Sequence, residues 1–426
     1  MEKLAIIFFA LLLPAAGAPA GTLLLRGATV HTVTHGTLTP GDVLVRDGRI
    51  AAVAPRIDEA ADVSIDLAGL HLFPGLISAS TDLGLVEISS VRASIDDQET
   101  GEFTPEIESW TAVNPDSELI PVSRANGITH FVPVPGGKLI SGASGMMAAR
   151  GWTIEDMTIR RRTAMHLFWP DHSLSVPGPN ASEKTKSLEE QARERLERVR
   201  TIDQFFADAE AWEKRQDGSP VVPAWQAMLP VVRGELPLVV HAQGLREIRA
   251  ALKWSATRPR LRIILEGGRD AWMLAGELAQ RKVPVIYSEV FTLPGQSSDA
   301  YDVQFRAPSI LEKAGVTVAI SEASGKSASS QRNLPYCAAQ ASAFGFSREA
   351  ALAAITLIPA QLHGAGDLLG SIEAGKEASF FAATGDILDI RSEVKRLWIS
   401  GAEQSLASRH TRLAERYRAR PAAAPK

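Results

Sequence analysis

The sequence predicts an α/β protein: a (β/α)8 barrel of the TIM type, together with a small β-sandwich built from both ends of the chain. Strand-rich segments with Gly and Asp turns stand at residues 21–72 and 370–403. Between them, apolar strand-like runs alternate with helical stretches, as in parallel sheets that are buried on both faces. We count eight such runs, the number that a closed barrel needs.

The N-terminal residues 1–20 have the pattern of a secretory signal peptide. Lys3 precedes an apolar stretch over residues 4–13, and the small residues Ala18-Pro19-Ala20 offer a cleavage site. The apolar stretch is too short to span a bilayer, and no later stretch is long and apolar enough to do so. We therefore predict a periplasmic or secreted protein that begins at Gly21, with a retained N-terminal anchor as the alternative.

Charge and cysteine content narrow the function classes. A formal charge of -4, spread evenly over 426 residues, leaves no basic surface for nucleic acid. The single cysteine, Cys337, excludes an internal disulfide. Because Cys337 stands among apolar residues in a predicted helix, we expect a buried thiol rather than a nucleophile.

The strand-rich ends predict the two parts of the sandwich, over residues 21–72 and 370–403. Asp47-Gly48 lies between two β-prone runs and is a strong hairpin signal. The predicted strands cover residues 23–30, 43–46, 50–53, 63–67, 379–383 and 394–399.

Residues 73–369 form the predicted barrel. Its eight runs are 76–80, 128–134, 145–150, 164–169, 236–241, 261–266, 283–288 and 316–321. After the fourth run, Ser187 and Glu190 predict a capping box at the start of a long amphipathic helix, whose Arg and Glu residues face solvent. Residues 404–426 predict a basic helix followed by a frayed tail.

Two motifs resemble the amidohydrolase superfamily. Phe73-Pro74-Gly75-Leu76-Ile77, leading to Ser80-Thr81-Asp82 and Gly84, is similar to the segment that opens the first barrel strand of that family. Gly370-Ser371-Ile372-Glu373-Ala374-Gly375 and the preceding residues 350–364 resemble its closing segment. Residues 81–106 and 112–124 resemble an exported, imidazolonepropionase-like branch that lacks the paired histidines His-x-His. The resemblance implies an amidohydrolase-like barrel with a degenerate metal-binding motif.

The family holds one or two divalent metals at the C-terminal ends of its strands. Its ligands are two His on strand one, a modified Lys or a Glu on strand four, His on strands five and six, and Asp on strand eight. The matching positions here are Ser80 and Asp82, His166, His241, Gly267 and Glu322. The resemblance thus implies His241, His166, Asp82 and Glu322 as metal ligands, with Glu289 past strand seven as a further carboxylate. Glu322 and Asp82 are the candidate catalytic residues, which would move the proton.

Two functions are compatible with these residues. The first is a hydrolase that acts on C–N bonds of a cyclic amide or dipeptide-like small molecule, with one divalent ion such as Zn, Mn or Fe. The second is a barrel without catalysis and without metal that binds a small molecule or a partner, because Ser and Gly replace imidazoles of the family. Metal content, and its dependence on His241, separates the two.

Simpler roles compete for each of the candidate residues. His241 is equally suited to a structural hydrogen bond, and His166 to packing beside Phe168. Asp82 is suited to capping the turn before Gly84.

Other polar residues are assigned structural roles. We expect Glu266 to pair with Arg262 or Arg269, and Ser144 lacks one residue of the Gly-x-Ser-x-Gly motif of serine hydrolases. The remaining histidines lack ligand spacing and are expected in solvent or capping positions, with His130 inside strand two as the exception. They are His31, His35, His71, His130, His172, His363 and His410.

Overall fold

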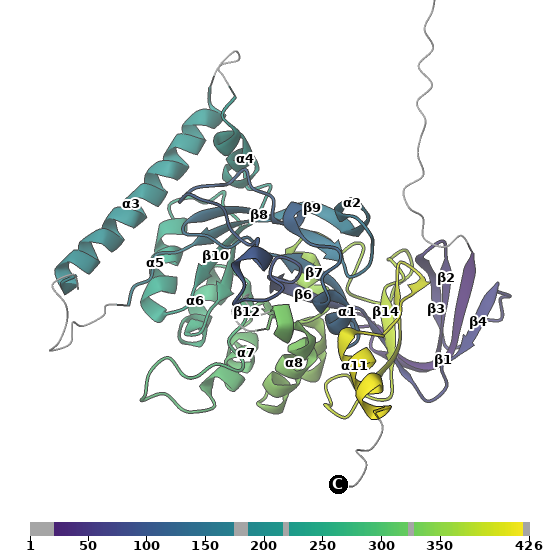
Figure 1. The fold of residues 1–426 in the computed structure, drawn as a ribbon. Helices are drawn as coiled ribbons and strands as arrows, with labels where there is room; N and C mark the ends of the chain where they lie inside the picture. Colours follow the sequence, from purple (N-terminus) through teal and green to yellow (C-terminus); the bar gives the residue numbers. More distant parts are fainter. Residues whose placement is uncertain (1–20, 174–185, 216–220, 323–327, 421–426) are drawn as a thin grey trace, which may run out of the picture.

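A computed structural model describes residues 21–173, 186–215, 221–322 and 328–420. A barrel occupies the centre of the molecule, and a sheet made from both chain ends lies beside it (Figure 1). The predicted signal peptide, residues 1–20, lies outside the described residues. Among the residues that are described, no helix combines the length and the apolar character that a membrane span requires.

The predicted strand-rich domain is one continuous sheet rather than two stacked sheets. Its order is β16-β15-β14-β5-β1-β2-β3, with β4 paired to β1. Phe381 of β14 lies opposite Phe73 of β5, so a C-terminal strand pairs directly with an N-terminal one. The strands are β1 (Thr22–His31), β2 (Thr37–Arg46), β3 (Arg49–Ala54), β4 (Val63–Asp66), β5 (His71–Pro74), β14 (Phe380–Ala383), β15 (Val394–Ile399) and β16 (Ala402–Glu403). The predicted Asp47-Gly48 hairpin joins β2 and β3, with φ angles of 47° and 74°.

The predicted barrel is present, with its eight strands in the order β13-β12-β11-β10-β9-β8-β7-β6. They are β6 (Leu76–Thr81), β7 (Ile128–Pro133), β8 (Ile140–Ala148), β9 (Thr158–Phe168), β10 (Leu238–Ala242), β11 (Ile263–Gly267), β12 (Val285–Tyr287) and β13 (Val318–Ile320). β8 runs antiparallel to both β7 and β9, whereas the other neighbours are parallel. The prediction of a parallel third strand is wrong because residues 134–139 are too few for a crossover helix between β7 and β8.

The barrel closes through a short segment between two helices. The amide of Ile77 on β6 donates to the carbonyl of Ile355, and the amide of Ile320 on β13 donates to the carbonyl of Ala354. Near the other end of these strands, the hydroxyl of Ser321 donates to the carbonyl of Ser80 over 2.7 Å. Inside the barrel, small and branched residues of six strands form an apolar layer, which consists of Ala79, Ala164, Val239, Ile264, Ile286 and Ala319.

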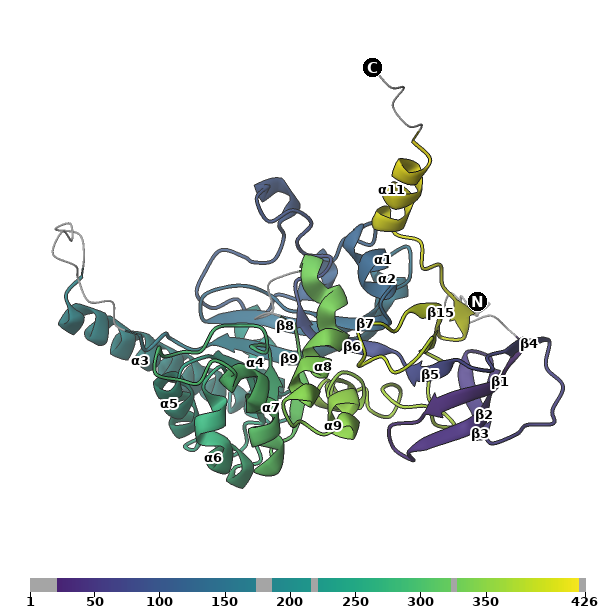
Figure 2. The ribbon, with the colours of Figure 1, turned by 90° about the horizontal axis from the view of Figure 1, so that it is seen from below.

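Helices cover the outside of the barrel and its N-terminal end. Figure 2 shows α5 to α9 gathered along one side of the sheet. Side chains of α10, Ile358 and Leu362, pack against the apolar layer from the N-terminal end of the strands. The helices are α1 (Leu119–Arg124), α2 (Ile154–Met157), α3 (Leu188–Glu213), α4 (Pro223–Val232), α5 (Leu245–Ser255), α6 (Ala275–Gln280), α7 (Val303–Lys313), α8 (Leu334–Ala343), α9 (Arg348–Ala353), α10 (Leu357–Leu362) and α11 (Arg409–Arg418).

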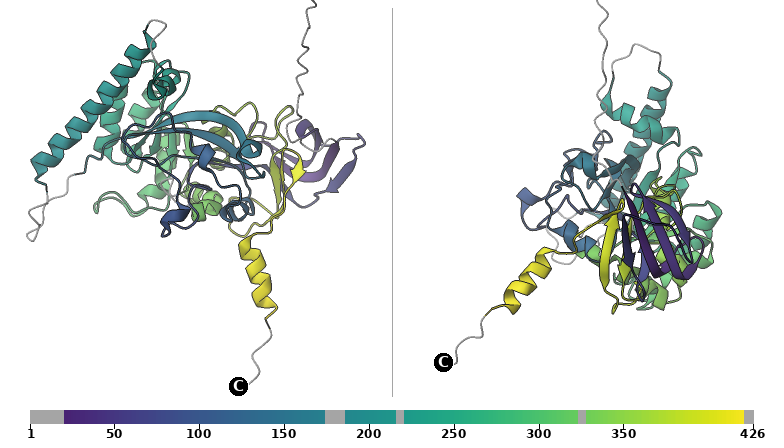
Figure 3. Two further views of the ribbon diagram at one scale, coloured as in Figure 1. Left: turned by 45° about the horizontal axis from the view of Figure 1, so that its top comes forward. Right: turned by 90° about the vertical axis from the view of Figure 1, so that its right-hand side faces the viewer.

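Two helices depart from the compact body. The capping box that Ser187 and Glu190 predict begins α3, but the buried residues of this helix all lie in its second half, from Ile202 onward. α11 stands away from the barrel (Figure 3) and is linked to the start of α1 by the ion pair of Arg412 with Glu118, 2.9 Å apart. Cys337 is buried in α8, as predicted, and burial raises the pKa of its thiol.

Candidate metal centre

Strand register brings three ionisable side chains together inside the barrel. His241 on β10 and Glu266 on β11 are direct register partners in a parallel pair, so they face the same way. His166 on β9 pairs with Val239, two residues before His241, and residues two apart share a face. All three lie above the apolar layer, because each follows one of its members by two residues.

The donor atoms of these residues form one compact group. One ligand atom from each of His166, His241 and Glu266 lies within 4.8 Å of the others, and this is the only such group of three found among the described residues. Nδ1 of His166 is 2.9 Å from Nε2 of His241, and Nδ1 of His241 is 2.9 Å from Oε2 of Glu266. The side chains of His166 and Glu266 are buried, whereas 16% of the His241 side chain is exposed. His241 therefore opens the group toward solvent.

Glu266 is a buried carboxylate with one oxygen still available. Its Oε1 accepts a hydrogen bond from Ser80, the residue that stands in place of a family histidine. Its Oε2 has no hydrogen bond of acceptable geometry among the described residues, despite the close approach of His241. Although burial alone would raise the pKa of Glu266, the close approach of His241 and the hydroxyl of Ser80 hold it below its ordinary value. Glu266 is therefore an anion with an unused lone pair.

The expected ion pair of Glu266 with Arg262 or Arg269 is wrong. Arg269 instead pairs with Asp270, 3.3 Å away, and Arg262 donates to the carbonyl of Glu235. Arg262 also lines the hollow where β10, β11 and β12 begin, at the opposite end of the strands from Glu266. Strand alternation is the signal that would have placed Glu266 inside.

A second half of the network reaches the N-terminal end of the barrel. Nε2 of His166 is 2.8 Å from the hydroxyl of Ser144 on β8, which is 3.2 Å from the hydroxyl of Thr163. Thr163 is 3.1 Å from Nδ1 of His363, whose Nε2 is 3.0 Å from the carbonyl of Ala79. His363 is fully buried, so the expectation of a solvent or capping position is wrong for it.

The predicted residues Asp82 and Glu322 form a separate carboxylate pair at the rim. Asp82 follows β6 and Glu322 follows β13, and both are buried, but neither belongs to the group of three donors. Burial, and secondly the negative charge of Asp82, raises the pKa of Glu322 to about 7. The turn after β6 is capped by the hydroxyl of Thr81, which accepts from the amide of Leu83. Glu289, which follows β12, is also buried at this rim.

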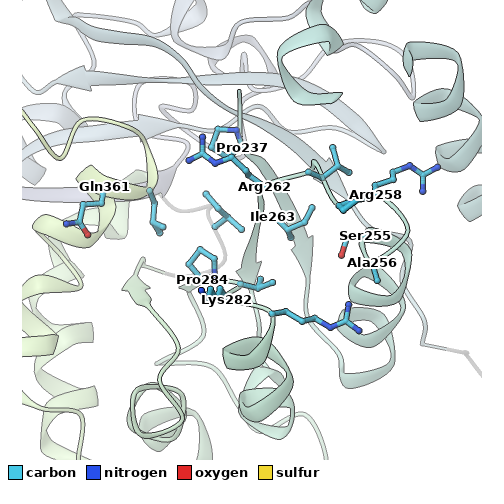
Figure 4. Close-up of a pocket in the computed structure, with 15 residues that line it drawn as sticks. Pro237, Ser255, Ala256, Arg258, Arg262, Ile263, Lys282, Pro284 and Gln361 are labelled. Atoms are coloured by element: carbon cyan, nitrogen blue, oxygen red, sulfur yellow. The ribbon is translucent and has the colours of Figure 1, made fainter. Parts of the chain in front are cut away.

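A distinct hollow of about 500 Å³ lies at the opposite end of the barrel, where β10, β11 and β12 begin (Figure 4). Four cations line it: Arg258, Arg262, Arg281 and Lys282. Arg258 and Arg281 already bind carboxylates of their own chain, Asp203 and Glu277. No carboxylate lines this hollow, so it lacks the groups that could hold a metal or move a proton.

Comparison with known proteins supports the resemblance that the motifs show. The amidohydrolase family profile matches residues 279–403. The fold is similar to that of an amidohydrolase from Thermotoga maritima MSB8, with a TM-score of 0.78 and 23% identity over 89% of this chain and 99% of that one. It is also similar to an adenosine deaminase from Xanthomonas campestris with bound zinc, with a TM-score of 0.53 and 18% identity over 93% and 97% of the two chains.

A prolidase complexed with N-methylphosphonate-L-proline has a TM-score of 0.53 and 14% identity, over 90% of this chain and 99% of that one. The family profile thus matches the C-terminal part of the chain, and the three solved structures share its fold. The imidazolonepropionase-like branch stays a prediction.

Proposed function

We propose that the protein is a metal-dependent hydrolase that cleaves a C–N bond in a small molecule, with the ion held by His166, His241 and Glu266. The observation that carries this proposal is the compact group of two imidazoles and one carboxylate inside an amidohydrolase-type barrel. Two His and one Glu form a known ligand set of catalytic zinc sites, which leave one position open. The prolidase and the adenosine deaminase with similar folds have names that denote C–N bond cleavage.

The residues present fit a divalent cation. Oε2 of Glu266 is a buried, negatively charged acceptor without an aligned hydrogen bond, and a cation would satisfy it. Burial, together with the neighbouring His241, lowers the pKa of His166 well below its ordinary value, so its ring is neutral, as a metal ligand must be. Imidazole and carboxylate ligands suit Zn, Mn or Fe. Asp82 and Glu322, which the sequence suggested as ligands, are assigned to proton transfer instead.

A bound divalent ion would supply a Lewis acid that makes water a nucleophile at neutral pH. Glu322, whose pKa is about 7, exists in both protonation states at neutral pH. In its ionised form it accepts a proton from the attacking water, and in its protonated form it returns that proton to the leaving nitrogen. Asp82 keeps the pKa of Glu322 high through its negative charge.

The segment after β12 offers contacts for an apolar part of the substrate. It follows the rim residue Glu289 and exposes Phe291 and Leu293, of which 56% and 85% of the surface is accessible. We therefore favour a cyclic amide or dipeptide-like compound with an apolar substituent. A periplasmic or secreted location is part of the proposal and rests on the pattern of residues 1–20.

The rival function is a barrel that binds a small molecule without turnover. In that case hydrogen bonds alone would hold the network around His166 and His241, and its polar groups would satisfy one another without a metal ion. Two features favour it: Ser80 replaces a histidine of the family motif, and Gly267 replaces the strand-six histidine. The two functions differ in one measurable quantity, which is the metal content.

Elemental analysis of the purified protein, after loading with Zn, Mn or Fe, tests the proposal. We expect about one equivalent in the wild-type protein and less than about a tenth in His241→Ala, because loss of one of three ligands opens the site. His130→Asn is the control, since His130 is a buried histidine of β7 that pairs with Glu377 outside the group. A wild-type content below about a tenth of an equivalent would favour the binding function.

Hydrolysis assays then define the bond that is cleaved. Cyclic amides and Xaa-Pro dipeptides are the probes, and release of product should require the added ion and Glu322. Turnover by the Glu322→Gln variant at the wild-type rate would remove Glu322 from the mechanism.

A further inference from the structure

The polar groups inside the barrel form a nearly closed ring of contacts. It begins at the carbonyl of Ala79 and passes through His363, Thr163, Ser144, His166, His241 and Glu266 to the hydroxyl of Ser80. Its two ends are therefore successive residues of β6. Each hydroxyl in it has only one hydrogen to donate, so the direction of one bond constrains the next.

The direction is fixed at the Ala79 end. A carbonyl oxygen only accepts, so Nε2 of His363 must carry a hydrogen. Burial lowers the pKa of His363 to about 4, so the ring is neutral and its Nδ1 is an acceptor. Among the described residues, the hydroxyl of Thr163 is the one hydrogen-bond partner of that nitrogen, 3.1 Å away. The carbonyl of Ser144, 3.2 Å from the same hydroxyl, is a second acceptor for its hydrogen, but only donation to His363 satisfies the buried Nδ1.

The same logic carries through Ser144 to His166. Because Thr163 uses its hydrogen on His363, its oxygen accepts from Ser144. Ser144 then has no hydrogen left for His166, so Nε2 of His166 donates to Ser144 over 2.8 Å. In the neutral ring that a metal ligand requires, Nδ1 of His166 then presents a lone pair toward His241.

At the Glu266 end of the ring, a lone pair of His241 faces the lone pair of His166. The carboxylate of Glu266, 2.9 Å from Nδ1 of His241, favours a hydrogen on that nitrogen. With the hydrogen of the ring on Nδ1, Nε2 of His241 turns its lone pair toward Nδ1 of His166, 2.9 Å away. Two lone pairs at that distance repel unless a positive charge, a proton or a metal ion, lies between them.

We propose that His363 is a positioning residue: through Thr163 and Ser144 it fixes the tautomer of His166 that presents Nδ1 to the ion. The identity of the ion rests on the proposed function, whereas the tautomer does not. His363 contacts neither the group of three donors nor the rim, and it acts only through the hydrogen-bond chain. Ligating imidazoles elsewhere gain affinity from outer partners that set the tautomer, which gives the expected size of the effect.

Nitrogen NMR of protein labelled with ¹⁵N-histidine tests the tautomer directly. Two-bond proton–nitrogen correlations show which ring nitrogen carries the hydrogen, and His166→Asn identifies the His166 signals. We expect Nε2 of His166 to be protonated and Nδ1 to be unprotonated in the wild-type protein. Thr163→Val, which keeps the shape and removes the hydroxyl, should abolish this single tautomer, whereas Thr163→Ser should retain it.

Zinc affinity, measured by competition with a chelator, is the second readout. Thr163→Val should weaken binding about 10- to 100-fold, and Thr163→Ser should restore it. Thr129→Val is the matched control, because Thr129 is a buried threonine on β7 whose hydroxyl lies 2.9 Å from Nδ1 of His130. Ser144→Ala breaks the same chain from another strand and replaces Thr163→Val if that variant does not fold.

Two results would overturn the inference. One is an unchanged His166 tautomer in Thr163→Val and Ser144→Ala. The other is an equal loss of zinc affinity in Thr129→Val, which would indicate a general packing effect. If the wild-type protein takes up none of Zn, Mn and Fe, the proposed function fails, but the NMR comparison still decides whether the hydrogen-bond chain from His363 through Thr163 and Ser144 sets the tautomer of His166.

Discussion

The two ends of strands β10, β11 and β12 carry ionisable side chains in opposite settings. At the C-terminal ends, His241 and Glu266 lie 2.9 Å apart, and the Glu266 carboxylate is almost entirely buried. At the N-terminal ends, Arg262 and Lys282 line a hollow and are exposed. The same strands thus hold the pair of His241 and Glu266, which water screens poorly, and the cations Arg262 and Lys282, which water screens well. Burial, rather than the number of charges, decides where charges couple strongly enough for chemistry.

The largest expected difference between the two ends is in stability. Glu266→Ala removes the buried carboxylate that pairs with His241 and should lower the free energy of unfolding by about 3–5 kcal/mol. Arg262→Ala, at the other end of the same strand, should change it by less than about 0.5 kcal/mol. Denaturant unfolding of both variants measures the contrast, and equal losses would contradict the role given to burial.

A second expected effect concerns the acid stability that buried histidines impose. The pKa of His363 is about 4 in the folded protein, below its ordinary value of 6.5, so the unfolded chain binds more protons between these pH values. The contribution of the neutral His363 to the free energy of unfolding is therefore fully present above pH 6.5. About 3 kcal/mol of it is lost as the pH falls toward 4. His363→Leu should reduce that decline by a similar amount, although it removes hydrogen bonds at all pH values.

Unfolding free energies at a series of pH values between 4 and 7 test this prediction. His410→Leu is the control, because His410 is exposed on α11 and should leave the slope unchanged. A slope that is the same in His363→Leu and in the wild-type protein would show that His363 is not neutral when buried.

A smaller effect is expected at the rim, where the two carboxyls interact. Burial is the larger cause of the raised pKa of Glu322, and the charge of Asp82 is the second. Asp82→Asn removes that charge and should lower the pKa of Glu322 only part of the way to its ordinary value. Because Glu322 acts as the base when ionised, the acid limb of kcat/KM should move to lower pH. An unmoved limb would mean that another group is the base.

The smallest effect is expected in the basic hollow. Lys282 lines the hollow of Figure 4 and is exposed, and no carboxylate partner is recorded for it among the described residues. Lys282→Ala should change stability by less than about 0.5 kcal/mol and leave metal content unaltered. Loss of bound metal in this variant would connect the two ends of the barrel.

Elements with local signals were predictable from the sequence. The Asp47-Gly48 hairpin and the capping box of Ser187 with Glu190 depend on neighbouring residues, and both are present. The eight barrel runs were found because apolar strands between helices are visible in the pattern. The direction of β8 was not predicted, because an apolar run does not indicate whether a strand is parallel or antiparallel to its neighbours. Only the short link of residues 134–139 indicates the reversal.

The candidate site was predicted in part, through positions that match the family. The structure brings His166 and His241 together and leaves Asp82 and Glu322 as a separate pair. Glu266 and His363 were missed because neither stands at a family ligand position. Glu266 could be placed by strand alternation, since it follows the buried Ile264 by two residues. His363 could not, because it follows α10, a helix that packs against the interior of the barrel from the N-terminal end of the strands.

The sequence by itself determined the strands, the division into a barrel and a strand-rich domain, and the resemblance to the amidohydrolase superfamily. Each of these follows from patterns within a few residues or from motifs. The tertiary structure alone decided which polar side chains meet, because contacts such as that between Ser80 and Glu266 join residues 186 positions apart. Strand register and barrel closure set those contacts, and they depend on the packing of the whole chain.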